Sequence, residues 1–128
     1  MEFQTLSGSV LAFIGDAVLS LQVREYLVNK GLTKAKALQS RSTDFVSAKA
    51  QAAFVKMLID QDRLSEHEML MYKRGRNDKS TSIAKNADVL TYRYSTGFEA
   101  LWGYLYLSEQ TQRLSALWLD YQEFVDGR

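Results

Sequence analysis

Residues 10–19 read Val-Leu-Ala-Phe-Ile-Gly-Asp-Ala-Val-Leu, an apolar stretch that contains a single acid, Asp16. Apolar side chains recur at three- and four-residue intervals from here onward, which predicts one face of a long α-helix. We expect this helix to begin at Ser7 or Ser9 and to end at position 30, because Gly31 can adopt the left-handed conformation that terminates many helices. The stretch therefore predicts a helical protein with one acid set into an apolar helix.

A second acid, Glu99, lies in a similar stretch at residues 97–107, Gly-Phe-Glu-Ala-Leu-Trp-Gly-Tyr-Leu-Tyr-Leu. A carboxylate among apolar side chains is costly unless it is paired, hydrogen-bonded or bound to a metal. Two such acids, far apart in the sequence, suggest that their helices cross and offer Asp16 and Glu99 to one cation. Because Mg²⁺ prefers oxygen ligands and often uses one or two protein carboxylates together with substrate phosphate, the pair favours a phosphodiester-cleaving site.

Glycines flank both acids. Gly15 directly precedes Asp16, and Gly97 and Gly103 lie on either side of Glu99. A glycine inside a helix costs about 1 kcal/mol relative to alanine, so it usually has a packing reason. We expect these glycines to let the two helices approach closely, an arrangement that simple helix packing would also explain.

The remainder of the chain also reads as helix, and proline is absent. Residues 65–68, Ser-Glu-His-Glu, form a capping box that starts a helix. Residues 73–82 contain no apolar side chain, and we predict a mobile polar loop there that extends as far as Asn86. Further helices are expected at 33–40, 42–59, 87–107 and 109–124, with a break at 94–96 where Ser95 or Thr96 caps the segment that carries Glu99. Residues 1–128 are thus predicted to form one all-α domain.

The composition excludes several classes of protein. Apolar residues make up 46% and charged residues 24%, as in an ordinary globular domain. The absence of cysteine excludes disulfides, zinc–thiolate sites and thiol nucleophiles, and a cytoplasmic setting fits better than a secreted one. No signal-peptide pattern and no apolar run of bilayer length occurs, so we expect neither a leader nor contact with a membrane.

Positive charge is concentrated between the two acids. Residues 73–93 carry six basic residues against two acidic ones, in a chain with a net charge of +1. Such a local excess is typical of a surface that meets an anionic partner, although an ordinary solvated loop has the same composition. We predict that five of these bases contact the phosphate groups of such a partner and set much of the salt dependence of binding: Lys73, Arg74, Arg76, Lys79 and Lys85.

Other features have less specific interpretations. Either acid alone could be an ordinary surface carboxylate, and the aromatic residues at 92–106 fit core or interface positions better than base stacking. The only histidine, His67, is expected at the surface, which disfavours a Ser–His nucleophile. Metal chemistry is the catalytic mode that remains.

Several motifs resemble those of one enzyme family. Residues 13–18, Phe-Ile-Gly-Asp-Ala-Val, resemble the signature helix of the ribonuclease III catalytic domain, and residues 96–105 resemble its second acidic helix. The segments 72–77, 85–86 and 91–96 are similar to the Mini-III branch in particular. The motifs keep their order and spacing, and the resemblance covers essentially the whole chain.

This resemblance implies the helical fold of the ribonuclease III catalytic domain in an obligate homodimer, whose signature helices pair across the symmetry axis. It implies Mg²⁺-dependent cleavage of double-stranded RNA, with Mn²⁺ as an alternative ion and with Asp16 and Glu99 as the catalytic, metal-binding carboxylates. The known role of the Mini-III branch implies the 23S ribosomal RNA precursor as substrate in the cytoplasm, and leaves a ribosomal protein open as a further partner. The branch lacks a separate double-stranded-RNA-binding domain, and none is seen in this sequence.

The chain differs from the longer ribonuclease III enzymes at three positions. Those enzymes carry additional carboxylates where this chain has Ser9, Ala12 and Thr96. Fewer protein ligands leave the number of metal ions per site open, and a Mini-III assignment tolerates this reduction better than an assignment to the longer enzymes.

Two other function classes stay open from the sequence. A non-catalytic, dimeric RNA-binding module for ribosome assembly would keep the fold without turnover, although the presence of both acids argues against it. A helical protein-interaction adaptor would use the aromatic face at 102–106 and would leave the basic stretch unexplained. Metal-dependent RNA cleavage would separate a nuclease from both.

Overall fold

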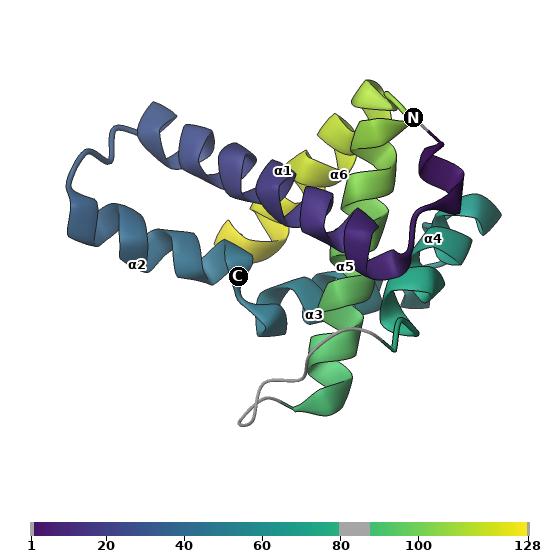
Figure 1. Cartoon of the computed structure of the whole chain (residues 1–128). Coiled ribbons are helices and arrows are strands. Elements are labelled where there is room, and N and C mark those ends of the chain that lie inside the picture. The colour runs from purple at the N-terminus through teal and green to yellow at the C-terminus, as the bar shows by residue number, and fades with distance from the viewer. Residues whose placement is uncertain (1, 80–87, 128) are drawn as a thin grey trace.

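The computed structural model describes residues 2–79 and 88–127, and all regular secondary structure in these ranges is helical (Figure 1). This confirms the predicted all-α class. No helix within these ranges is long and apolar enough to cross a membrane. The elements are a short 3₁₀ helix η1 (Phe3–Thr5) and the helices α1 (Gly8–Asn29), α2 (Ala35–Val46), α3 (Ala48–Asp60), α4 (Glu66–Arg76), α5 (Val89–Leu107) and α6 (Thr111–Asp126).

Helix α5 is the central helix, and α1, α3, α4 and α6 all contact it (Figure 1). Every residue from 95 to 105 except Glu99 is buried, as expected for a helix that is apolar all round. The rings of Phe98 and Trp102 stack with their centroids 4.6 Å apart, and Tyr121 of α6 lies 5.4 Å from Phe98. The core therefore surrounds the segment of α5 that carries Glu99.

Three predicted helix ends are confirmed. The Ser7 hydroxyl accepts a hydrogen bond from the N–H of Val10 at 3.3 Å and caps α1. Gly31, just after α1, has the left-handed φ of +93° that glycine adopts without strain. Ser65 and Glu68 form the capping box that starts α4. The first two fix the ends of α1, the helix that carries Asp16.

The predicted division between the second and third helices, near residues 40–42, is wrong. Helix α2 runs on to Val46, and α3 begins at Ala48. The residue between them, Ser47, is extended (φ −67°, ψ 147°), and its hydroxyl caps α3 by accepting from the N–H of Ala50. Serine breaks a helix only where the backbone takes a capping conformation, and elsewhere it is tolerated within the helix. The break at Ser47 brings the first turn of α3 to α5.

The predicted polar loop is partly helical, because α4 continues to Arg76. Lys73, Arg74 and Arg76 form its last turn, where basic side chains are favoured by the partial negative charge of a helix C-terminus. Only Lys79, of the predicted phosphate-binding bases, lies after α4 within the described residues. Lys85 falls outside those residues.

The predicted break at residues 94–96 is also wrong, since α5 is continuous from Val89 to Leu107. The hydroxyls of Ser95 and Thr96 donate to the carbonyl of Tyr92 at 2.8 and 3.0 Å, which satisfies them within the helix. The cap of α5 is Asp88, whose side chain accepts from the N–H of Leu90.

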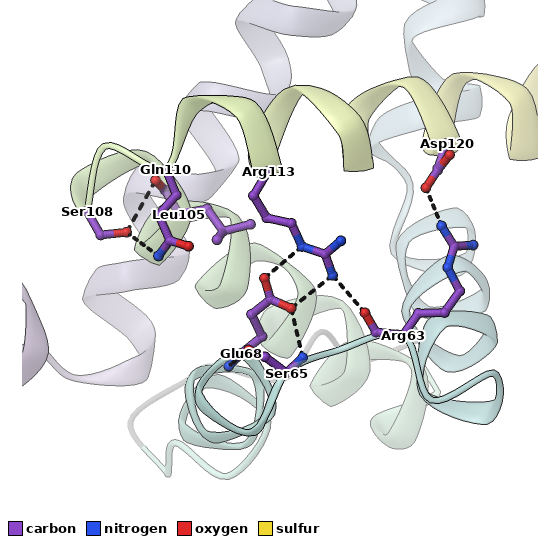
Figure 2. A network of polar contacts seen from close by, with 8 residues as sticks. All are labelled: Arg63, Ser65, Glu68, Leu105, Ser108, Gln110, Arg113 and Asp120. Carbon is purple, nitrogen blue, oxygen red and sulfur yellow. Dashed lines mark hydrogen bonds and ion pairs between the residues drawn. The ribbon is translucent and has the colours of Figure 1, made fainter.

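An ion pair between a half-buried arginine and a buried glutamate joins α6 to the start of α4 (Figure 2). Arg113 donates from Nε to Oε2 of Glu68 at 2.8 Å and from Nη2 to Oε1 at 2.9 Å. The same guanidinium donates to the carbonyl of Arg63 at 2.7 Å, and the N–H of Ser65 donates to Oε1 of Glu68 at 2.9 Å. Burial alone would raise the pKa of Glu68, but the hydrogen bonds from Arg113 and Ser65 hold that pKa below its ordinary value.

Replacing Arg113 with Met is expected to lower the free energy of unfolding by about 2–3 kcal/mol near neutral pH, because it leaves the buried Glu68 carboxylate without its cation. The loss should shrink as the pH falls through the pKa of Glu68, since a protonated Glu68 needs no cation. Urea unfolding measures both effects. Arg63→Met, which breaks only the exposed pair with Asp120, is the control and should cost less than about 1 kcal/mol. Equal losses in the two variants would contradict the assignment.

Candidate active site

Helix α1 crosses α5 (Figure 1), and glycines form the contact between the two helices. Asp16 of α1 and Glu99 of α5 lie close enough at this crossing to interact electrostatically. A Cβ atom built on Gly15 would lie 1.8 Å from the carbonyl oxygen of Glu99, and one built on Gly103 would lie 2.0 Å from that of Leu11. No side chain fits at either position. This confirms the expectation that the flanking glycines allow the helices to approach closely, and it brings Asp16 and Glu99 together.

The third glycine that the sequence singled out has a different neighbour. A Cβ atom on Gly97 would lie 2.6 Å from the ring of Tyr72 on α4. Gly97 therefore allows α4, rather than α1, to pack closely on α5.

Asp16 and Glu99 influence each other electrostatically. Burial, followed by charge repulsion and hydrogen bonding with Asp16, raises the pKa of Glu99 to about 8, and a hydrogen bond from Gln51 partly offsets the rise. Asp16 itself is exposed in the isolated chain, so the expectation of an acid enclosed by apolar groups holds better for Glu99. Neighbouring apolar side chains of α1 are exposed with it, and Phe13 is 77% exposed.

Glu99 makes the stability of the metal-free protein depend on pH. Its folded-state pKa of about 8 lies above the ordinary value of 4.5, so the stability it confers is complete below the ordinary value and is lost as the pH rises through about 8. Glu99→Gln mimics the protonated acid. In EDTA we expect this variant to be more stable than the wild type at about pH 9, by up to about 3 kcal/mol, and similar to it near pH 4. Urea unfolding across this range measures the difference, and a difference independent of pH would contradict a raised pKa.

The residues present fit a hard divalent cation. Two carboxylates that repel each other, one of them with a strongly raised pKa, gain most when a cation binds between them. Of the three positions where longer enzymes have acids, Ala12 is buried and offers no oxygen. The Thr96 hydroxyl donates to the carbonyl of Tyr92, and the N–H of Ser9 donates to Oδ2 of Asp78 at 2.8 Å. No group of three or more ligand-type side chains gathers within residues 2–79 and 88–127.

Gln51 is a site residue that sequence reasoning missed. It lies in the first turn of α3, is 1% exposed, and donates from Nε2 to Oε2 of Glu99 at 3.4 Å. A glutamine in a helix of small residues carries no local signal of such a contact. Even a correct prediction of the α2–α3 break would have shown only that Gln51 lies in the first turn of α3. It would not have shown that Gln51 lies beside Glu99.

The predicted phosphate-binding bases do not behave as one set. Lys73 and Lys79 are exposed. Arg74 donates to the carbonyls of Gln4 and Leu6, the latter at 3.2 Å, and Arg76 lies over the ring of Tyr72 with 5.6 Å between the guanidinium carbon and the ring centroid. Arg74 and Arg76 therefore have structural contacts of their own.

His67 is exposed, as predicted, and its ring lies 5.1 Å from that of Tyr104. It is remote in sequence from both acids. The contacts of Asp16 and Glu99 give the site its chemistry without it.

Comparison with known proteins identifies the family of this chain. Residues 9–110 match the Ribonuclease III domain family. The chain is 49% identical over 116 residues to the Mini-ribonuclease 3 of Enterococcus faecalis, covering 91% of this chain and 88% of the relative, and 48% identical over 117 residues to that of Streptococcus pneumoniae, covering 91% of each. A crystal structure of a Fusobacterium nucleatum protein superposes with a TM-score of 0.78 at 29% identity, over 87% of this chain and 88% of the other. The chain therefore belongs to the Mini-ribonuclease 3 branch of the ribonuclease III family of endoribonucleases.

Proposed function

We propose that this endoribonuclease cleaves double-stranded RNA with Mg²⁺, and that Asp16 and Glu99 are the carboxylates that bind the ion. The observation that carries the proposal is the glycine-mediated crossing of α1 and α5, which holds these two acids together in a chain of this family. Mn²⁺, which also accepts oxygen ligands, is expected to substitute.

The site residues have distinct roles in this proposal. Bound Mg²⁺ would activate water and stabilise charge on the scissile phosphate and on the departing oxygen. Glu99 must give up its proton before it can bind a cation, because its pKa of about 8 keeps it largely protonated at neutral pH. Asp16 and an ionised Glu99 are both negative and repel each other. A cation bound between them would relieve this repulsion, so Asp16 favours cation binding. The carbonyl of Glu99 against Gly15 fixes the distance between the two helices.

The exposed apolar face of α1 supports a homodimer. Val10, Phe13 and Leu21 are 44%, 77% and 60% exposed, and exposed apolar side chains in this number on one helix suggest a surface covered by a partner. A cavity of ≈780 Å³ lies between this helix and the α5–α6 junction, and its lining includes Ile14, Leu21 and Tyr106. Symmetric pairing of α1 in the dimer would cover this face and place a cleavage site on each subunit.

RNA recognition in this proposal relies on shape and phosphate contacts. Bases in A-form RNA lie in a deep, narrow major groove that side chains cannot read, so basic residues would hold the duplex by its backbone. Lys73 and Lys79 are exposed and available for such contacts. The 23S ribosomal RNA precursor is the proposed substrate in the cytoplasm, supported by the likeness to bacterial Mini-ribonuclease 3 proteins, and a ribosomal protein is a candidate helper.

Replacing Lys73, Lys79 and Lys85 together with Gln is expected to weaken duplex binding. The slope of log affinity against log salt should fall by about one for each RNA phosphate that these lysines no longer neutralise. The set spares Arg74, whose bonds to backbone carbonyls would confound the result. Binding is measured by fluorescence anisotropy in Ca²⁺, at several salt concentrations. Lys34→Gln with Lys36→Gln is the charge control. An unchanged slope in the triple variant would show that this segment does not bind RNA.

The proposed function is tested by incubating the wild-type protein with a long, labelled RNA duplex, with Mg²⁺ and with EDTA. We expect cleavage only with Mg²⁺, to products that carry 5′ phosphates. Duplex binding without cleavage at any Mg²⁺ concentration would overturn the proposal and favour a non-catalytic RNA-binding module.

A further inference from the structure

Gln51 is a buried polar side chain at the proposed metal site, and the inference drawn from it rests on the proposed function. It is 1% exposed, and a buried amide is costly unless it is hydrogen-bonded. Its Nε2 donates to two acceptors, the carbonyl of Val46 at 3.2 Å and Oε2 of Glu99 at 3.4 Å.

The chemistry of the amide group gives these contacts a direction. The NH₂ group of a glutamine has two donors and no acceptor, so it interacts best with the ionised form of a carboxylate. Gln51 thus favours the charged form of Glu99, which is the form that binds a cation.

The backbone fixes the position of this amide. Val46 is the last residue of α2, and Ser47 forms the extended break before α3, so the Val46 carbonyl has no following helical turn to accept from. Gln51 fills that role from the first turn of α3. The hydrogen bond to Val46 on α2 uses one N–H of the amide, and the other N–H is directed to Glu99 on α5.

We propose that Gln51 is a positioning residue that holds the carboxylate of Glu99 in place beside Asp16 for metal binding. It does not act on the RNA or on the ion itself. Partners of this kind orient metal-binding side chains, and their loss typically lowers metal affinity or activity about 10- to 100-fold.

A purely structural role is the competing explanation, because the bond to Val46 alone could stabilise the α2–α3 break. The positioning role and the structural role predict different effects when Glu99 is also replaced. A positioning residue changes Mg²⁺ binding through Glu99, whereas a structural residue changes stability to the same extent whether or not Glu99 is present.

The test replaces Gln51 with Met, which has a similar length and no donor. We expect the dissociation constant for Mg²⁺, measured by calorimetry without RNA, to rise about 10- to 100-fold. The Mg²⁺ concentration for half-maximal cleavage should rise in parallel, with duplex affinity in Ca²⁺ unchanged. Gln61→Met makes the same chemical change at an exposed position at the end of α3 and should leave these quantities unchanged. In a Glu99→Gln background, Gln51→Met should have no further effect on Mg²⁺ binding.

A second measurement keeps the proposal testable if Gln51→Met does not fold. In the wild-type protein, the NMR signals of the Gln51 side-chain amide should shift on addition of Mg²⁺ and should differ in Glu99→Gln. Signals that are unchanged in both experiments would overturn the proposal, as would a folded Gln51→Met variant whose Mg²⁺ affinity is within twofold of the wild type.

The outcomes for Gln51 and for the proposed function are separate. If the wild type binds Mg²⁺ and shows the amide shifts but cuts no duplex, the nuclease proposal fails and the role of Gln51 stands. If the wild type cuts duplex RNA and Gln51→Met binds Mg²⁺ normally, the role of Gln51 fails and the nuclease proposal stands.

Discussion

Replacing Asp16 with Asn, or Glu99 with Gln, is expected to lower the rate of duplex cleavage by on the order of 10³-fold. Each substitution keeps the size of the side chain but removes a negative charge from a pair that has no third acid within the described residues to replace it. The rate is measured in single-turnover reactions with enzyme in excess, so that substrate binding does not limit it. RNA binding in Ca²⁺ should change far less than the rate.

A matched control separates this effect from a general change in charge. Glu25 is an exposed acid on the same helix as Asp16, and Glu25→Gln should cleave at the wild-type rate. Dimerisation and thermal unfolding of all three variants should show folded protein. Full activity in either Asp16→Asn or Glu99→Gln would remove that residue from the proposed metal site.

The second large effect is expected from Gly15→Ala, a change of one methyl group. Alanine normally stabilises a helix relative to glycine by about 1 kcal/mol. Here the added Cβ would lie 1.8 Å from the Glu99 carbonyl oxygen and 2.9 Å from the N of Gly103, both backbone atoms of α5. The helices must move apart, and we expect a net loss of at least about 2 kcal/mol in the free energy of unfolding.

The sign of the change is the test. Chemical denaturation should show Gly15→Ala to be less stable than the wild type, while Ser20→Ala on the same helix should be neutral or slightly stabilising. Because the displaced carbonyl belongs to Glu99, Mg²⁺ affinity should fall as well. A Gly15→Ala protein more stable than the wild type would mean that the crossing adapts without cost.

The helical class and the two unusual acids could be predicted because their signals are local. An acid beside a glycine in an apolar helix is visible in a short stretch of sequence. The roles of serine and threonine were not predictable in this way. Ser47 breaks a helix, whereas Ser95 and Thr96 bond back to Tyr92 within one, and the choice depends on packing that the sequence pattern does not reveal.

The sequence predicted the charged residues of the candidate site but not the contacts that these residues make. The contact between Gln51 and Glu99 joins residues 48 positions apart and depends on where α2 ends. The role of Arg74 was missed for a similar reason, since its acceptors are backbone carbonyls near the start of the chain. A basic side chain shows its charge in the sequence but not whether that charge already has a partner.

Hydrogen bonds of two residues, Arg74 and Asp78, join the end of α4 to the residues at and just before the start of α1. Arg74 donates to the carbonyls of Gln4 and Leu6, and Asp78 accepts from the N–H of Ser9. One way to alter which duplexes are cut is to graft the RNA-binding segment of a relative into this chain. The result would therefore depend on whether the graft begins before or after Asp78. A graft that starts after Asp78 keeps these contacts. One that starts at Lys73 replaces Arg74 and Asp78, and it loosens the helix that carries Asp16 wherever the donor has residues that cannot make the same hydrogen bonds.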